Sequence, residues 1–150
     1  MKRLFILLAA CVAIPAFADR DEGHEHRTTF KADPVWLKEC GSCHVAYPAN
    51  MLPAASWKKL MGGLQDHFGT DASLTPDEQR HVTDFLVGQA GRGSASSLRI
   101  TQSAWFRHEH DEVRADVWKR AAVKSPANCQ ACHLEAAQGR FDEHAIRIPR

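Results

Sequence analysis

The sequence of 150 residues lacks an excess of charge of either sign, since it has 19 basic and 18 acidic residues. A nearly neutral chain offers no electrostatic footprint for nucleic acid or for an anionic membrane surface, so we expect neither as a partner. Beyond residues 1–18 the sequence also lacks an apolar run long enough to span a bilayer. No nucleophile, base and orienting group stand together in the sequence, so we assign no catalytic residue.

Residues 1–18 have the pattern of a secretory signal peptide, with a short basic start, an apolar stretch and an Ala-Phe-Ala cleavage site at residues 16–18. The apolar stretch is too short for a stable membrane helix. Lipoprotein processing at Cys11 is an alternative, but it would leave an unusually short apolar stretch. The sequence therefore predicts an exported, periplasmic protein that begins at Asp19 with a flexible arm over residues 19–32, and places Cys11 outside the fold.

The four remaining cysteines stand in two C-x-x-C-H motifs. Such motifs are typical of covalent haem attachment. Two thiols three residues apart on a helical turn match the two vinyl groups of a haem and become thioethers, and the next histidine binds the iron as proximal ligand. The motifs use every cysteine after the export segment, so we expect two covalently attached c-type haems as cofactors. The predicted attachment residues are Cys40, Cys43 and His44 in the first motif and Cys129, Cys132 and His133 in the second.

Three other roles for these cysteines fit less well. A redox-active C-x-x-C pair usually accompanies a βαβ pattern, and we find no strands in the sequence. A single structural zinc site needs ligands much closer together than Cys43 and Cys129, which are separated by 85 residues. Two ordinary disulfides would not explain why a histidine follows both pairs.

Helix signals predict a mainly α fold with two small haem-binding modules, the first over residues 33–90. Asp33 before Pro34 is a helix N-cap pattern. A later segment carries an apolar stripe with a period of 3.6 residues and is followed by Gly69, a plausible helix C-cap. The helices predicted in the first module cover residues 34–44, 54–68 and 75–88.

The Gly/Ser-rich stretch 91–99 predicts a linker to a second module over residues 100–150. We expect this module to be irregular and helical, with an extended tail over residues 141–150 that packs across the second haem. Modules this small bury little apolar surface, so the porphyrins are expected to complete their cores and the apo-protein to be largely unfolded. The helical segments predicted in the second module are 101–113, 116–123 and a short helix from Ser125-Pro126 through the second motif.

The first haem iron needs a sixth ligand unless it is open to a small ligand. We rank His67 first, because it lies three residues after Leu64 at the edge of the apolar stripe. Met61 lies on the same stripe and is ranked second. His81, at the margin of the next apolar helix face, is third.

For the second iron, His110 is the preferred ligand because it shares an apolar helix face with Phe106. His108 projects toward the charged side of the same segment, and His144 lies in another charged segment, so both are weaker alternatives. Two imidazoles on each iron would give low reduction potentials, because methionine ligation raises the potential. The alternative is a dihaem protein with one open five-coordinate iron that binds a small ligand or acts as an oxidoreductase.

In these features the sequence resembles the dihaem cytochrome c family, small two-domain periplasmic proteins of proteobacteria. The resemblance covers nearly the whole chain after the export segment. The residues that carry it are the two C-x-x-C-H motifs, His67-Phe68-Gly69, Trp105-Phe106 with His110, the Ser125-Pro126-Ala127-Asn128 lead into the second motif, and the ending Ile146-Arg147-Ile148-Pro149.

This resemblance implies a first module similar to class I cytochrome c and a second module of less standard fold. It also implies that both irons have two histidine ligands, with His67 and His110 at the distal positions. The function implied is electron transfer rather than turnover of a substrate. The partners implied are a high-spin monohaem cytochrome as acceptor and a membrane cytochrome b as donor.

Overall fold

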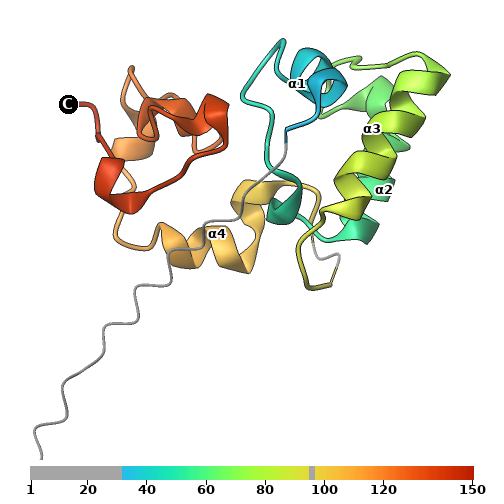
Figure 1. The fold of residues 1–150 in the computed structure, drawn as a ribbon. Helices are drawn as coiled ribbons and strands as arrows, with labels where there is room; N and C mark the ends of the chain where they lie inside the picture. Colours follow the sequence, from blue (N-terminus) through green and yellow to red (C-terminus); the bar gives the residue numbers. More distant parts are fainter. Residues whose placement is uncertain (1–31, 95–96) are drawn as a thin grey trace, which may run out of the picture.

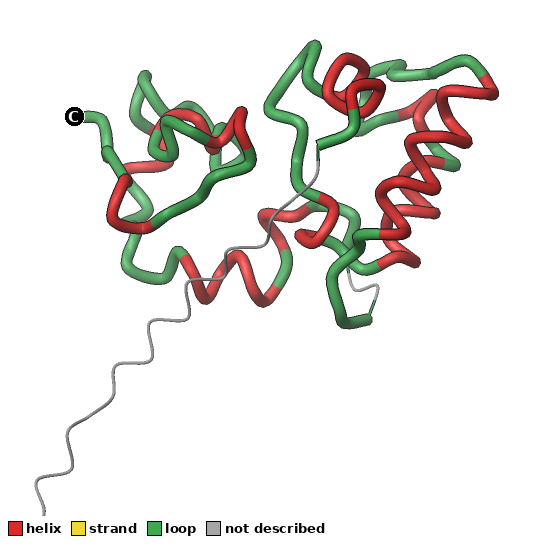
Figure 2. The backbone as a smooth tube through the Cα atoms, in the orientation of Figure 1, coloured by secondary structure: helices red, strands yellow, loops and turns green. Residues whose placement is uncertain are grey.

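The computed structural model of the protein describes residues 32–94 and 97–150 (Figure 1). The predicted signal peptide and nearly all of the predicted arm lie outside the described residues. Within these residues the α-helices are α1 (Pro34–Cys40), α2 (Ala54–Met61), α3 (Pro76–Gly88) and α4 (Ala104–Glu109), joined by short 3-10 turns. Across the described residues there is no strand, and none of the helices is long and apolar enough to cross a membrane (Figure 2). The mainly α fold class is confirmed.

Helix α1 begins as its capping pattern predicts but ends earlier than expected. The Asp33 carboxylate accepts hydrogen bonds from the backbone N–H groups of Val35 (3.0 Å) and Trp36 (2.9 Å). The helix ends at Cys40, and Gly41 caps it with an N–H bond to Leu37. Glycine is a poor helix former, so the rest of the first motif turns out of the helix, and its predicted continuation to residue 44 is wrong.

Helices α2 and α3 pack together, with α1 against α3 (Figure 1). A capping box between Thr75 and Glu78 starts α3, and the Gln79 side chain donates a 2.6 Å hydrogen bond to the carbonyl of Met61 at the end of α2. The buried apolar residues of this part form one cluster, which includes residues from all three helices. Its members are Trp36, Ala46, Ala49, Leu52, Trp57, Met61, Leu64, Val82 and Leu86.

The chain returns from α3 beside the start of α2. The Gly91 N–H donates to the carbonyl of Leu52 at 2.9 Å. A Cβ at Gly91 would collide with the backbone carbonyl of Asn50, so only glycine allows this close approach. The start of the predicted linker, residues 91–99, is therefore bonded to the segment just before α2.

After α4 the chain is built mostly from 3-10 turns, as Figure 2 shows. Helix α4 is shorter than the predicted segment 101–113, and a single 3-10 turn, Val117–Lys119, replaces the predicted helix over 116–123. The second motif begins in another such turn, Cys129–Ala131, rather than in an α-helix. The buried apolar residues of this half are only Phe106, Val117, Val123 and Ala136, too few to hold long helices.

The C-terminal tail closes over the second motif. The Arg147 N–H donates a 2.9 Å hydrogen bond to the carbonyl of Cys132, and the Arg120 side chain donates one of 2.7 Å to the carbonyl of Pro149. In Figure 1 this half lies to the left, α1 to α3 lie to the right and α4 runs along the base. The module boundaries at residues 33–90 and 100–150 stay predictions.

Candidate functional site

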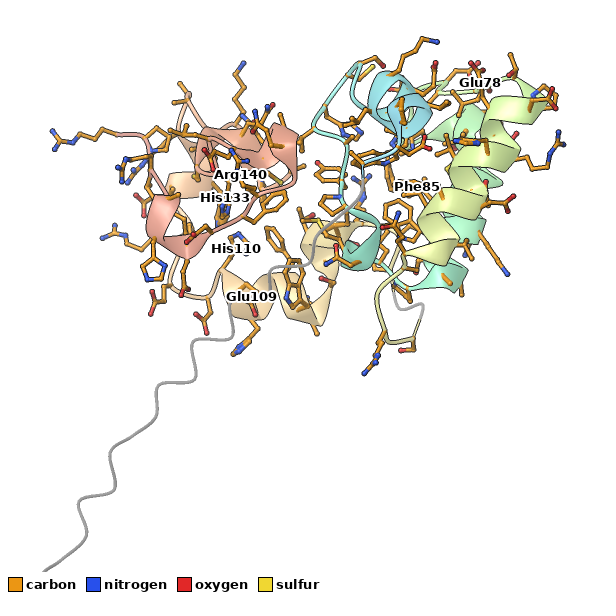
Figure 3. All side chains as sticks on the ribbon, in the orientation of Figure 1. Glu78, Phe85, Glu109, His110, His133 and Arg140 are labelled. Carbon is orange, nitrogen blue, oxygen red and sulfur yellow. The ribbon has the colours of Figure 1, made fainter. Side chains whose placement is uncertain are left out.

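The histidine of each motif lies beside one other histidine. The ring centroids of His44 and His67 are 6.1 Å apart, with the ring planes 20° apart. The centroids of His133 and His110 are also 6.1 Å apart, with planes 74° apart. Figure 3 shows His110, at the end of α4, below His133. We call His44 with His67 the first pair, and His133 with His110 the second pair.

His67 reaches His44 from a tight turn, not from a helix. Helix α2 ends at Met61, because two glycines follow it, and the predicted extension to residue 68 is wrong. The backbone groups of His67 and Thr70 bond to each other in both directions, at 2.8 and 3.2 Å. Between them, Phe68 and Gly69 both have positive φ, 56° and 95°. Two central residues at positive φ define a type I′ turn, so Gly69 serves this turn and not a helix end.

His110 is held at the end of α4, which is capped at its start by the Ser103 hydroxyl. Its Nδ1 lies 2.9 Å from the carbonyl of Phe106, and its ring stacks on the Phe106 ring with centroids 4.1 Å apart. The predicted shared face of His110 and Phe106 is therefore present. The Trp118 ring also contacts His110, at 5.9 Å between centroids.

Backbone carbonyls set which ring nitrogen is protonated in His44 and His110. A carbonyl can only accept, so the Nδ1 atoms of His44, 2.7 Å from the Val45 carbonyl, and of His110 must carry the proton. This leaves Nε2 of both rings with a free lone pair, the form in which histidine binds a metal. His133 differs, because its Nδ1 is buried without a hydrogen-bond partner among the described residues. A buried polar atom without a partner is costly, so the surroundings of His133 differ from those of His44 and His110.

The spacing of both pairs fits a metal ion between two imidazoles. A metal–imidazole bond is about 2 Å long and the ring centre lies roughly 1 Å beyond the bonded nitrogen, so two imidazoles on opposite sides of one ion have centres roughly 6 Å apart. Both observed distances are 6.1 Å. The cysteines that would hold the porphyrins precede His44 and His133 directly in the chain, so the donor sets fit two c-type haems.

Burial favours the neutral form of one imidazole in each pair. Desolvation lowers the pKa of His67, and the neighbouring His44 and Arg99 lower it further. Desolvation likewise lowers the pKa of His133, with a smaller effect from His110. Neutral imidazole is the metal-binding form, so both sites favour ligation at neutral pH.

The four motif cysteines form no disulfide with one another in the structure. Burial raises the pKa of Cys40 to about 11, with a further contribution from Glu39, and it also raises the pKa values of Cys129 and Cys132. A redox-active C-x-x-C pair instead needs a thiol with a lowered pKa. No three metal-binding side chains converge within residues 32–94 and 97–150, so the two motifs do not combine into a zinc site there.

The other ligand candidates lie elsewhere in the structure. The Met61 side chain, at the end of α2, is only 2% exposed and lies within the apolar cluster. His81 places its Nε2 2.8 Å from the Asp33 carboxylate at the start of α1. His108 is exposed on α4, and His144 is exposed beside Asp142, 3.2 Å from its carboxylate.

Three aromatic contacts to the pairs were not found from the sequence. The rings of Tyr47 and His44 are stacked with centroids 4.8 Å apart, and Phe141 meets His133 at 5.4 Å. Trp118, beside His110, is the third. For these contacts the sequence offers one signal, which is that Tyr47 lies only three residues after the motif histidine His44. Phe141 begins the tail that was predicted to pack across the second haem.

The comparisons with known proteins point to one family. Residues 36–141 match the sequence model of the family described as dihaem cytochrome c. A crystal structure of DHC purified from Rhodobacter sphaeroides is 43% identical, with a TM-score of 0.67, and the match covers 74% of this chain and 98% of that one. The diheme cytochrome type c from Shewanella baltica OS155 is 38% identical, with a TM-score of 0.71, over 77% of this chain and 92% of that one.

A comparison with curated protein sequences gives no significant match. The family match spans both motifs and both histidine pairs, and the two solved structures are matched over nearly their whole length. The chain therefore belongs to the dihaem cytochrome c family: it carries two covalently bound c-type haems, serves in haem-based electron transfer and has redox proteins as partners.

Proposed function

We propose that the protein is an electron carrier in which each haem iron is bound by two histidines, His44 with His67 and His133 with His110. The observation that carries the proposal is the 6.1 Å separation of the ring centroids in both pairs. The contacts of Met61, His81 and His144 and the exposure of His108 support the same choice.

When bound, the haems supply reversible one-electron chemistry. The chain supplies the ligands and their orientation: backbone carbonyls fix the tautomers of His44 and His110, and the Phe106 ring fixes the plane of His110. Two imidazoles on each iron give low reduction potentials and leave no open position for a substrate. An electron carrier that does not turn over a small molecule follows from that ligation.

We also propose that the protein works in the periplasm, relaying electrons from a membrane cytochrome b to a high-spin monohaem cytochrome. The export pattern of residues 1–18 supports the location, and the family resemblance supports the partners. Stopped-flow mixing of the reduced protein with an oxidised monohaem cytochrome tests the relay. Rapid oxidation at low salt is expected, and no electron transfer at any salt concentration would contradict it.

Absorption and electron paramagnetic resonance spectra of the oxidised and reduced protein test the ligation. We expect two low-spin haems per chain and no methionine charge-transfer band. We also expect two distinct ferric signals, because the ring planes are 20° apart in the first pair and 74° apart in the second. A high-spin component would instead indicate an open iron, and ligand binding or catalysis would replace the carrier function.

Single substitutions assign the individual ligands. His67→Met should raise the potential of one haem only, and His110→Met should raise that of the other, because a thioether favours the ferrous state relative to imidazole. His81→Gln and His108→Gln are matched controls at histidines outside both pairs. A potential that is unchanged in His67→Met, or shifted by His81→Gln, would overturn the assignment of His67.

A further inference from the structure

Tyr47 connects the two histidine pairs. It is the only tyrosine in the sequence, and its ring stacks on His44 with the centroids 4.8 Å and the planes 25° apart. Its hydroxyl donates a 2.7 Å hydrogen bond to the carbonyl of Ala127, 80 residues further along the chain. Ala127 stands two residues before Cys129, the first cysteine of the second motif. One side chain therefore touches the proximal histidine of the first site and the backbone leading into the second.

A second observation brings the two motifs together, because both contribute residues to one cavity. A cavity of about 330 Å³ is lined by Gly41 to His44 of the first motif, by the neighbouring Leu37 and Val45, and by Gln130 and Ala137 of the second half of the chain. Gln130 lies inside the second motif. The two attachment motifs thus face one another across a short distance, and Tyr47 spans the boundary between them.

We propose that Tyr47 is a positioning residue that holds the two haem sites in the arrangement through which electrons pass from one to the other. The proposal rests on the function proposed above, with His44 as an iron ligand. In each exchange one site is oxidised by one electron and the other is reduced by one. Tyr47 keeps its proton and is not oxidised, because its part is to fix the contact and to supply a hydrogen-bonded route between His44 and the second motif.

The contribution of this bond sets the size of the expected effect. A neutral hydrogen bond between protein groups contributes about 1 kcal/mol net. We call a molecule docked when the bond from Tyr47 holds the two sites together, and separated when they have moved apart. Loss of the bond should raise the ratio of separated to docked molecules about fivefold. In Tyr47→Phe the ring that stacks on His44 remains and only the bond to Ala127 is lost. The hydrogen-bonded route becomes a gap, so exchange within docked molecules should slow as well.

Ser56 offers a matched control. Its hydroxyl donates to the carbonyl of Ser97 at 3.3 Å, also joining distant parts of the chain, but it contacts neither histidine pair. Ser56→Ala removes a bond of the same chemical type. Both variants should lower the melting temperature slightly, whereas only the loss of the Tyr47 bond should affect exchange between the sites.

The experiment is performed on the holoprotein with both haems attached. After rapid reduction of a fraction of the haems by a photochemical donor, the redistribution of electrons between the two sites is followed by absorption. In Tyr47→Phe we expect a lower exchange rate and about a fivefold rise in the ratio of slowly to rapidly exchanging molecules. In Ser56→Ala we expect wild-type exchange.

Exchange that is unchanged in Tyr47→Phe, or equally slowed in Ser56→Ala, would overturn the role of Tyr47. Tyr47→Leu also removes the ring, and it should shift the potential of the first haem alone, because only His44 loses a stacked neighbour. A shift of both potentials would contradict this. The ferric spectrum separates the two proposals. A high-spin component in the wild type would contradict ligation by two histidines. Low-spin Tyr47 variants with normal electron exchange would contradict only the positioning role of Tyr47.

Discussion

The residue next to His67 is held in an unusual backbone conformation. Phe68 has a φ of 56°, in the left-handed region that L-residues with bulky side chains rarely adopt, and Gly69 follows at 95°. Such strain tends to be retained where it positions functional groups. Here it closes the turn that places the His67 ring against His44.

Gly69→Ala tests whether this turn positions His67. A Cβ at Gly69 would meet no atom within 4 Å, so the only cost is that of a left-handed alanine, about 1–2 kcal/mol in the free energy of unfolding. Chemical denaturation of the holoprotein measures that loss. Because the turn carries His67, the spectrum of one haem should change as well.

Gly88→Ala is the control for this substitution. A Cβ at Gly88 also meets no atom within 4 Å, but Gly88 is the last residue of α3 and has no positive φ. Alanine there should leave stability unchanged or raise it by about 0.5–1 kcal/mol. Equal losses from the two variants would show that the backbone of the His67 turn has no special requirement.

At the scale of elements, the starts of α1, α2 and α3 and the end of α3 were predictable, whereas the ends of α1 and α2 and the start of α4 were not. Starts depend on side chains within one turn: Asp33 caps α1 as the sequence predicts, and α3 begins at the predicted place, where Thr75 and Glu78 form a capping box. The end of α2 depends on Gly62 and on tertiary contacts. The apolar stripe continues to residue 68, so the sequence pattern alone predicts a longer helix.

The local parts of the site could be predicted from the sequence, whereas its long-range contacts could not. The motifs C-x-x-C-H are local and could be read directly. His67 lies beside His44 but on a type I′ turn, whose usual Asn-Gly or Asp-Gly signal is replaced here by Phe68-Gly69. The contact of Tyr47 with Ala127 joins residues 80 apart, and no sequence period predicts such a contact.

Asp33 gives α1 a pH dependence. Burial raises the pKa of Asp33, but the Trp36 N–H and the His81 side chain, which both bond to the carboxylate, outweigh that effect and hold the pKa below its ordinary value of 3.8. A carboxyl with a lowered folded-state pKa stabilises the fold above its unfolded pKa and loses that contribution as pH falls through the folded value.

Asp33→Asn isolates this contribution. Asparagine caps a helix as well as aspartate but does not titrate, so the variant should lose less stability than wild type between pH 5 and more acidic conditions. Thermal unfolding across that range measures the difference, with Asp84→Asn at an exposed position of α3 as control. Parallel pH profiles for wild type and Asp33→Asn would contradict the role of the charge.

At the scale of the whole molecule, the apolar core is unevenly divided. Nine buried apolar residues form one cluster around α1, α2 and α3, whereas the part from α4 onward buries only four. Small units with so little buried surface are rarely stable alone, so we expect the second half to depend on its haem for a core. The first half retains helix packing of its own.

Replacing Cys129 and Cys132 with alanine tests this dependence. Without thioether bonds the second haem is lost on denaturing extraction, so one covalent haem per chain should remain. Amide hydrogen exchange should become fast from α4 to the tail, because the hydrogen bond from Arg147 to Cys132 and the contacts around His133 lose their support. Protection in α2 and α3 should persist, since their side chains pack in the separate cluster.

The matched variant replaces Cys40 and Cys43 with alanine and removes the first haem instead. Here α2 and α3 should keep part of their protection, because Trp57 and Leu86 remain buried against protein atoms and not only against a porphyrin. The two variants thus separate covalent attachment from core formation. If the Cys129 and Cys132 variant kept two covalent haems, the second motif would have been misread. If the same variant kept full hydrogen-exchange protection after α4, that half would fold without covalent haem attachment, and its few buried apolar residues would be sufficient.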